Sequence, residues 1–202
     1  MNDAGIKRFK KLEICGVFFI FSFAVLLHFA YELTYGSIVG ILFGAVNESV
    51  WEHVKIFAMP YVVWGIIELA FAIPYFRQFV VAKVFGLYIQ SGLIIAFFYL
   101  YTFFTDTSIL WLDILSVFVW VSVSQLFSFK ITTGEKDIRN LFPFALGLLF
   151  LFLMMYFCFT AVPPHIDIFR DPVTGLYGII PENIDVGAYF MNNAELYGSF
   201  FL

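Results

Sequence analysis

The sequence predicts an all-α membrane protein built as a bundle of about five transmembrane helices. Of its 202 residues, 62% are hydrophobic and only 13% are charged, whereas soluble globular proteins are nearer a quarter charged. The chain also contains several apolar runs of about twenty residues, each long enough to cross roughly 30 Å of hydrocarbon. Helices are the expected spanning elements because every backbone amide in lipid needs an internal hydrogen-bond partner.

Five ranges are expected to span the membrane, at about 14–35, 51–75, 80–104, 108–129 and 141–161. Pro60 lies inside the second range and predicts a kink. Residues 37–46 are apolar but too short to cross, so they predict a re-entrant or interfacial segment, or a tight cap over the bundle. Residues 162–202 are rich in proline and polar turns and contain no spanning run. They predict an extramembrane C-terminal tail that follows a helical domain of residues 1–161.

Basic residues predict how the chain is oriented in the membrane. Two of them, Lys55 and Arg170, fall on one side of the expected spans. The others fall at the N-terminus and in the second-to-third and fourth-to-fifth connections: Lys7, Arg8, Lys10, Lys11, Arg77, Lys83, Lys130, Lys136 and Arg139. Because Lys and Arg favour the cytoplasmic side, we expect a multi-pass protein of the cell membrane with a cytoplasmic N-terminus and an extracytoplasmic C-terminus.

The segment from Val46 to Lys55 holds the densest group of ionisable residues beside the expected spans. Glu48, Glu52 and Lys55 are spaced i, i+4, i+7, and His53 lies about 100° around the helix from Glu52. Ionisable groups near membrane depth are costly and by default mark a functional site. This segment is therefore the expected centre of function.

Other polar residues are expected at the same depth. His28 and Glu32 lie one helical turn apart on the outer half of the first span, and Asp113 lies near the outer start of the fourth. His165 follows the fifth span, and the tail segment that contains it can form a lid over the site. The three histidines and most of the membrane-proximal acids are thus predicted to meet in one layer near the outer face.

Structural explanations exist for several of these residues. Ser49 followed by Glu52 fits a helix-capping box, in which each side chain bonds the other residue's backbone N–H. Asp171 begins an Asp-Pro-x-x-Gly sequence typical of a turn. Glu68 is expected near the cytoplasmic interface, where Arg77 or Lys83 can pair with it.

Three stretches together resemble a known family. They are Val46-Asn47-Glu48-Ser49-Val50-Trp51-Glu52-His53-x-Lys55, His28-x-x-Tyr31-Glu32, and Asp171-Pro172-x-Thr174-Gly175-x-Tyr177-Gly178. The chain is similar over nearly its whole length to a family of small bacterial integral membrane proteins classified only as a domain of unknown function. The resemblance implies a polytopic membrane protein and no particular activity.

Three functional hypotheses follow from the residues. In the first, His28, His53 and a carboxylate from Glu32, Glu48 or Glu52, with Glu32 as the preferred ligand, hold a divalent metal, most plausibly zinc. Glu48 and Glu52 then move protons, and Lys55 stabilises a developing anion during hydrolysis of a lipid or peptide-like substrate at the outer leaflet.

In the second hypothesis, the same acids bind or transport a cation or a small amine. In the third, the charged cluster is a structural cap that locks the first two spans of a subunit or accessory protein. Nothing in the sequence indicates a nucleic-acid partner, and the oligomeric state is left open.

Overall fold

The structure is a computed structural model that describes residues 2–72 and 75–180, so the predicted tail beyond residue 180 lies outside the described residues. Five helices are long and apolar enough to cross a membrane. They are α1 (Asp3–His28), α4 (Val50–Ala72), α5 (Phe76–Thr105), α6 (Leu110–Thr133) and α7 (Phe142–Ala161). Over the described residues the chain forms no β-strand, only an isolated bridge between Arg170 and Tyr177. The predicted all-α membrane fold is confirmed.

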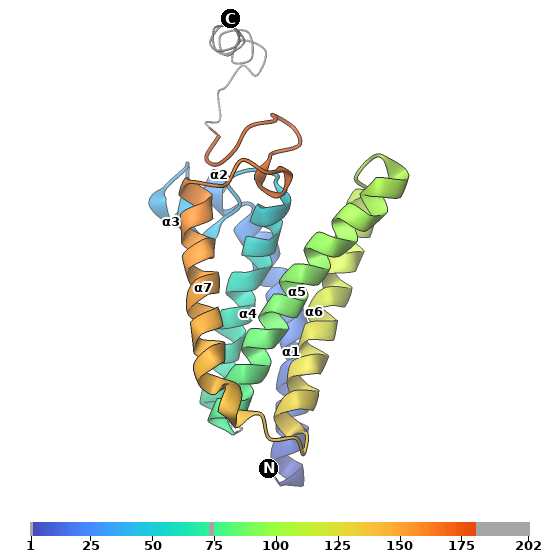
Figure 1. The fold of residues 1–202 in the computed structure, drawn as a ribbon, viewed down its shortest axis with the longest axis vertical. Helices are drawn as coiled ribbons and strands as arrows, with labels where there is room; N and C mark the ends of the chain where they lie inside the picture. The colour runs from blue at the N-terminus through green and yellow to red at the C-terminus, as the bar shows by residue number, and fades with distance from the viewer. Residues whose placement is uncertain (1, 73–74, 181–202) are drawn as a thin grey trace, which may run out of the picture.

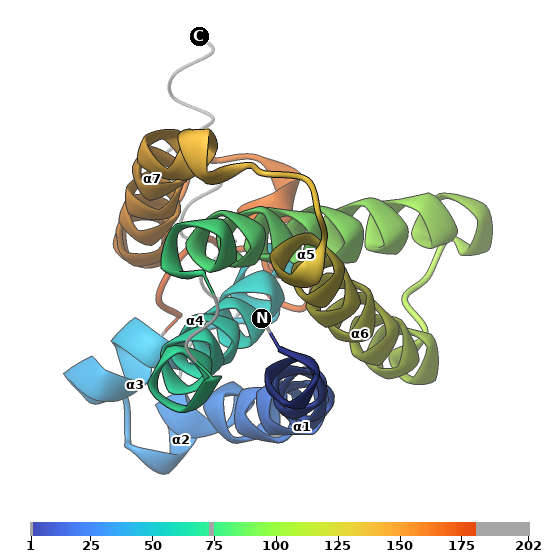
Figure 2. The ribbon, with the colours of Figure 1, turned by 90° about the horizontal axis from the view of Figure 1, so that it is seen from below.

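The long helices run side by side, with the N-terminus at one end of the bundle and α2, α3 and the tail at the other (Figure 1). We call these the lower and the upper end. Helix α4 packs against α1 on one side and α5 on another (Figure 2). Helix α6 packs against both α1 and α5, and α7 packs against α5. Buried side chains of α4 such as Val54, Ala58 and Tyr61 form the centre of the core.

Helix α1 ends earlier than the first expected span. It is capped by Asn2, whose side chain accepts a hydrogen bond from the Gly5 N–H, and it stops at His28. A break at Phe29 separates it from the short helix α2 (Ala30–Leu33). Tyr35 and Gly36 then take left-handed φ values of 52° and 68° and turn the chain back. As a result, the Ala45 N–H reaches the Leu27 carbonyl (3.3 Å), one of the carbonyls left open at the end of α1.

The short apolar segment between the first two spans forms helix α3 (Ile38–Phe43) at the upper end (Figure 1). Ser37 caps it by accepting a hydrogen bond from the Gly40 N–H (3.2 Å). Gly40 lies against the backbone of Ala30, and a side chain there would collide with Thr34. Ile38 and Val39 remain largely exposed. This geometry agrees with an interfacial cap.

The described part of the tail folds over the upper end of α4. It contains the single 3-10 turn η2 (Asp167–Phe169), and the Phe169 ring packs against Trp51 with centroids 5.4 Å apart. Asp171 Oδ1 accepts hydrogen bonds from the N–H groups of Val173 and Thr174, both at 2.7 Å. The predicted turn at Asp171 is confirmed.

Candidate metal site

The start of α4 is built by hydrogen bonds within the Val46–Lys55 segment. Ser49 Oγ accepts from the Glu52 N–H (3.4 Å), and Asn47 Oδ1 accepts from the Ser49 N–H (2.9 Å). Glu52 Oε2 accepts from the Val46 N–H (3.0 Å). The capping box is therefore half formed, because Glu52 bonds Val46 rather than the backbone of Ser49.

The tail holds the residues immediately before α4. Asp171 Oδ2 accepts a hydrogen bond from the Glu48 N–H (2.9 Å), and Asn47 Nδ2 donates to the Gly178 carbonyl (2.8 Å). Asp171 is only 3% exposed, so the bond to Glu48 is shielded from competing water. These contacts fix the backbone from which the Glu48 side chain projects.

Glu48 lies between two histidines. Its Oε1 is 3.8 Å from His28 Nε2, and its Oε2 is 3.5 Å from His53 Nε2. The imidazole rings face each other with centroids 5.4 Å apart. When each of the three residues offers one ligand atom, these three atoms all lie within 4.8 Å of one another.

The hydrogen bond of His53 determines which of its nitrogens faces the cluster. Its Nδ1 lies 2.9 Å from the carbonyl of Ser49, the residue just before α4. A carbonyl oxygen only accepts, so Nδ1 carries a hydrogen and Nε2 is the ring nitrogen that faces Glu48. This is the outer-shell arrangement that commonly orients a metal-binding histidine. His28 Nδ1 is buried and has no hydrogen-bond partner among the described residues.

Two histidines and one glutamate are a donor set that zinc accepts in catalytic sites, where a fourth position stays open for water. Ligand atoms around a tetrahedral zinc with bonds of about 2.0–2.1 Å lie roughly 3.3 Å apart. The two Glu48 distances are close to that value but belong to different carboxylate oxygens. With one ligand atom from each residue the separations are at most 4.8 Å, so the three side chains must move closer together to hold a tetrahedral ion. The side chains are 28% (His28), 37% (His53) and 50% (Glu48) exposed, which leaves the site accessible to water.

Two further carboxylates lie beside this cluster without belonging to it. Glu32, the expected ligand, is exposed on α2 and close enough to His28 to interact with its charge. Asp113 near the start of α6 interacts with His53 and accepts a hydrogen bond from the Tyr101 hydroxyl (2.6 Å). His165 stacks on Tyr177 at 4.6 Å and is not part of the cluster.

Glu52 and Lys55, both expected as catalytic, form a buried ion pair instead of lining this cluster. Lys55 Nζ lies 2.6 Å from Glu52 Oε2, and the side chains are 0% and 3% exposed. Lys55 also donates to Thr160 Oγ1 on α7 (2.9 Å) and to the Ile41 carbonyl on α3 (3.4 Å). The pair therefore links α4 to α3 and α7.

A family model matches residues 1–179 and describes a family of unknown function, DUF6512. The chain belongs to this family. No curated protein and no solved structure compared with the chain matches it. In this DUF6512 member, parts of the three stretches that carry the resemblance meet at the upper end: His28 and His53 flank Glu48, and Asp171 binds the Glu48 backbone.

The sequence prediction had placed Glu48 on a helical stripe with Glu52 and Lys55. That stripe is wrong at Glu48, because α4 begins only at Val50 and leaves Glu48 outside the helix. The tail was expected as a lid over the site, but the specific hydrogen bond from the Glu48 N–H to Asp171 was not predicted. The only sequence signal for it is that the motif and the Asp-Pro-x-x-Gly turn occur in the same chain.

Proposed function

We propose that this protein is a metal-dependent membrane hydrolase whose metal, zinc by preference, is held by His28, Glu48 and His53. The observation that carries the proposal is the placement of Glu48 between two imidazole Nε2 atoms, at 3.8 and 3.5 Å. The Ser49 carbonyl is hydrogen-bonded to the His53 ring, and Asp171 is hydrogen-bonded to the Glu48 backbone. Groups outside the ligand set orient ligands in this way in metal sites.

The residues around the cluster suit a hydrolytic reaction. A zinc ion with an open position lowers the pKa of its bound water toward about 7. The charge of Asp113 acts on His53 and that of Glu32 on His28, and with a metal bound either carboxylate would be a candidate general base for its water. Lys55 is fully buried with Glu52, so the anion-stabilising role expected for it has no support in the geometry.

We infer the side and type of substrate from charge and depth. Lys7, Arg8, Lys10 and Lys11 lie in the first half of α1 at the lower end, which the positive-inside rule assigns to the cytoplasm. The upper end, with the tail, then faces the extracytoplasmic side of the cell membrane. A site at that depth favours an ester or amide in a lipid or peptide-like substrate that is reached from the outer leaflet.

Metal content tests the proposal first. Elemental mass spectrometry of the purified protein should find about one zinc or similar metal per chain, lost in His28→Ala, His53→Ala and Glu48→Gln. Glu32→Gln is the matched control, because it removes a carboxylate beside the cluster that is not a ligand, and it should keep the metal. Metal-free wild type after zinc reconstitution, or full metal content in Glu48→Gln, refutes the site.

Turnover separates the hydrolase from a metal-binding or transport protein that uses the same side chains. Fluorogenic lipid esters and amides in lipid nanodiscs should be cleaved by the zinc-loaded wild type and spared by Glu48→Gln. Loss of turnover with retained metal in Asp113→Asn or Glu32→Gln identifies the general base. Stoichiometric zinc without cleavage of any ester or amide tested favours cation binding or transport instead.

A further inference from the structure

The lower half of the bundle contains a second group of charged side chains, contributed by four helices. Lys83 of α5 lies 2.8 Å from Glu13 Oε2 of α1 and 2.6 Å from Glu68 Oε2 of α4. Lys83 donates hydrogen bonds to Glu13 Oε2 and to Gln125 Oε1 of α6 (2.7 Å), whereas its contact with Glu68 is an ion pair. Glu68 is 0% exposed, Glu13 is 4% exposed and Lys83 is 7% exposed. Glu13 lies in the first half of α1, which starts at the lower end, whereas Glu48 lies just before the upper start of α4, so this group is separate from the metal site.

The charges of this group do not balance. Two carboxylates face one ammonium group. Glu13 Oε1 and both carboxylate oxygens of Glu68 are buried without a hydrogen-bond partner among the described residues. An uncompensated buried charge is strongly unfavourable. A single positive charge is therefore needed to make the group neutral.

Neighbouring groups offer hydrogens rather than metal ligands. Trp64 lies close to Glu68 and Ser128 close to Glu13, and Trp64 Nε1 and Ser128 Oγ are buried without a partner among the residues described. An indole nitrogen only donates. A metal cation needs several further oxygen acceptors, so this environment favours a proton over a metal ion.

The two carboxyl groups are also close to each other. Glu13 Oε2 and Glu68 Oε2 both contact the same Lys83 Nζ, at 2.8 and 2.6 Å, and two carboxyl groups this close can share a hydrogen bond only if one of them carries a hydrogen. A second proton would leave Lys83 without a counter-ion. The occupancy is therefore limited to one proton.

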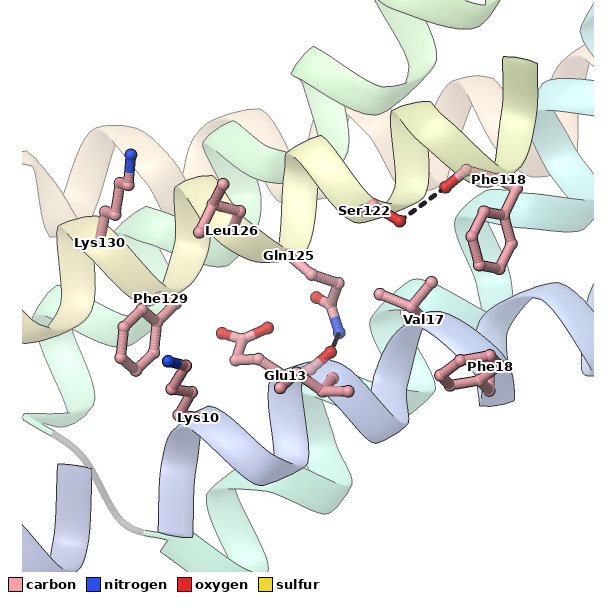
Figure 3. A pocket seen from close by; sticks show the side chains of 11 residues that line it. Lys10, Glu13, Val17, Phe18, Phe118, Ser122, Gln125, Leu126, Phe129 and Lys130 are labelled. Atoms are coloured by element: carbon pink, nitrogen blue, oxygen red, sulfur yellow. Dashed lines mark hydrogen bonds between the residues drawn. The ribbon is translucent and has the colours of Figure 1, made fainter. Parts of the chain in front are cut away.

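A cavity of about 390 Å³ between α1 and α6 reaches this group from the lower end (Figure 3). Glu13 and Gln125 line it, and Gln125 Nε2 donates to the Glu13 carbonyl (3.3 Å). Lys10 and Lys130 also line the cavity. Glu13 therefore borders this cavity, although it is only 4% exposed and lies within a membrane-spanning helix.

We propose that Glu13 and Glu68 form a proton-binding site that holds one proton between them and exchanges it through this cavity. The charged or titratable groups that face the site are Lys83 from α5, Lys10 from α1, Tyr61 from α4 and Lys130 from α6. Lys83 keeps the site from taking up a second proton. Intramembrane acids of this kind mark proton pathways in membrane proteins.

Infrared difference spectroscopy of the full chain in nanodiscs tests the site without a known substrate. At neutral pH the wild type should show the C=O band of one protonated carboxyl group, with a shift in D₂O. Glu13→Gln and Glu68→Gln should each abolish it, because the remaining carboxylate pairs with Lys83 and stays ionised. Glu48→Gln, which removes a carboxyl group at the upper end, should retain it. Leu126→Trp, which fills the cavity, should slow the shift in D₂O.

Three results overturn the proposal. A wild type with no protonated carboxyl group shows that both acids are ionised. A band that appears only when sodium is replaced by choline shows that a metal cation, not a proton, occupies the site. A band that survives in Glu13→Gln belongs to another residue. If Glu68→Gln does not fold, the wild-type spectrum and Glu13→Gln still decide.

Discussion

Replacing Lys55 by methionine should destabilise the protein by about 3–5 kcal/mol, the usual cost of removing one partner from a buried ion pair. The substitution keeps an unbranched side chain of similar length and removes only the ammonium group. Glu52 then remains buried at 2% exposure, with the Val46 N–H as a hydrogen-bond donor at 3.0 Å.

The magnitude follows from the short Lys55–Glu52 distance. At 2.6 Å, two unit charges attract by about 6 kcal/mol at an effective dielectric constant of 20. Lys55 also loses its hydrogen bonds to Thr160 and Ile41. In the wild type, part of the attraction between the two charges offsets the cost of burying them. The net loss of stability when Lys55 is replaced is therefore about 3–5 kcal/mol. For a chain of this size the melting temperature should fall by on the order of 10 °C.

Thermal unfolding in detergent, followed by tryptophan fluorescence, measures this effect. Lys55→Met combined with Glu52→Gln should recover most of the loss, since the pair is then neutral and Gln still accepts from Val46. Lys136→Met, in an exposed loop, should change stability by no more than about 0.5 kcal/mol. A Lys55→Met variant as stable as wild type, or a double variant no better than the single one, refutes a structural role for this pair.

Further predictions concern the tail, the helix cap and the helix contacts. Asp171→Asn should weaken zinc binding about 10–100-fold by calorimetry, whereas the exposed Asp167→Asn should not; equal affinities would show that the tail does not position Glu48. Ser49→Ala should cost about 1 kcal/mol in unfolding free energy and leave metal content intact. Gly16→Ala should cost about 1–3 kcal/mol, because its methyl group would overlap Gln125 and Trp64. Gly92→Ala, which meets nothing within 4 Å, is the control; a similar loss in both variants would contradict this packing.

The expected positions of His28 and Glu32 show where sequence reasoning stops. One helical turn separates them only if the helix continues, but α1 ends at His28 and Glu32 lies on α2. The end of α1 depends on the left-handed turn at Tyr35 and Gly36 and on Ala45 reaching Leu27. These contacts involve residues distant from His28 along the chain, so helical periodicity does not contain them.

Glu13 shows the same limit at the lower end. It precedes the first expected span and was given no role from the sequence, whereas α1 begins at Asp3 and carries Glu13 into the bundle. The predicted pairing of Glu68 was open between Arg77 and Lys83, and packing of α4 against α5 selects Lys83. Only the assembled bundle shows that Glu13 shares the same lysine.

The sequence alone determined the membrane class, the five apolar helices, the short apolar segment between the first two of them and the turn at Asp171. Each depends on hydrophobicity or on hydrogen bonds between near neighbours, which local sequence specifies. The tertiary structure alone decided that Glu48 lies between two histidines, that Glu52 and Lys55 turn inward, and that two acids share Lys83. Those placements depend on where helices end and which faces meet, because a side chain's partners are set by packing between distant segments.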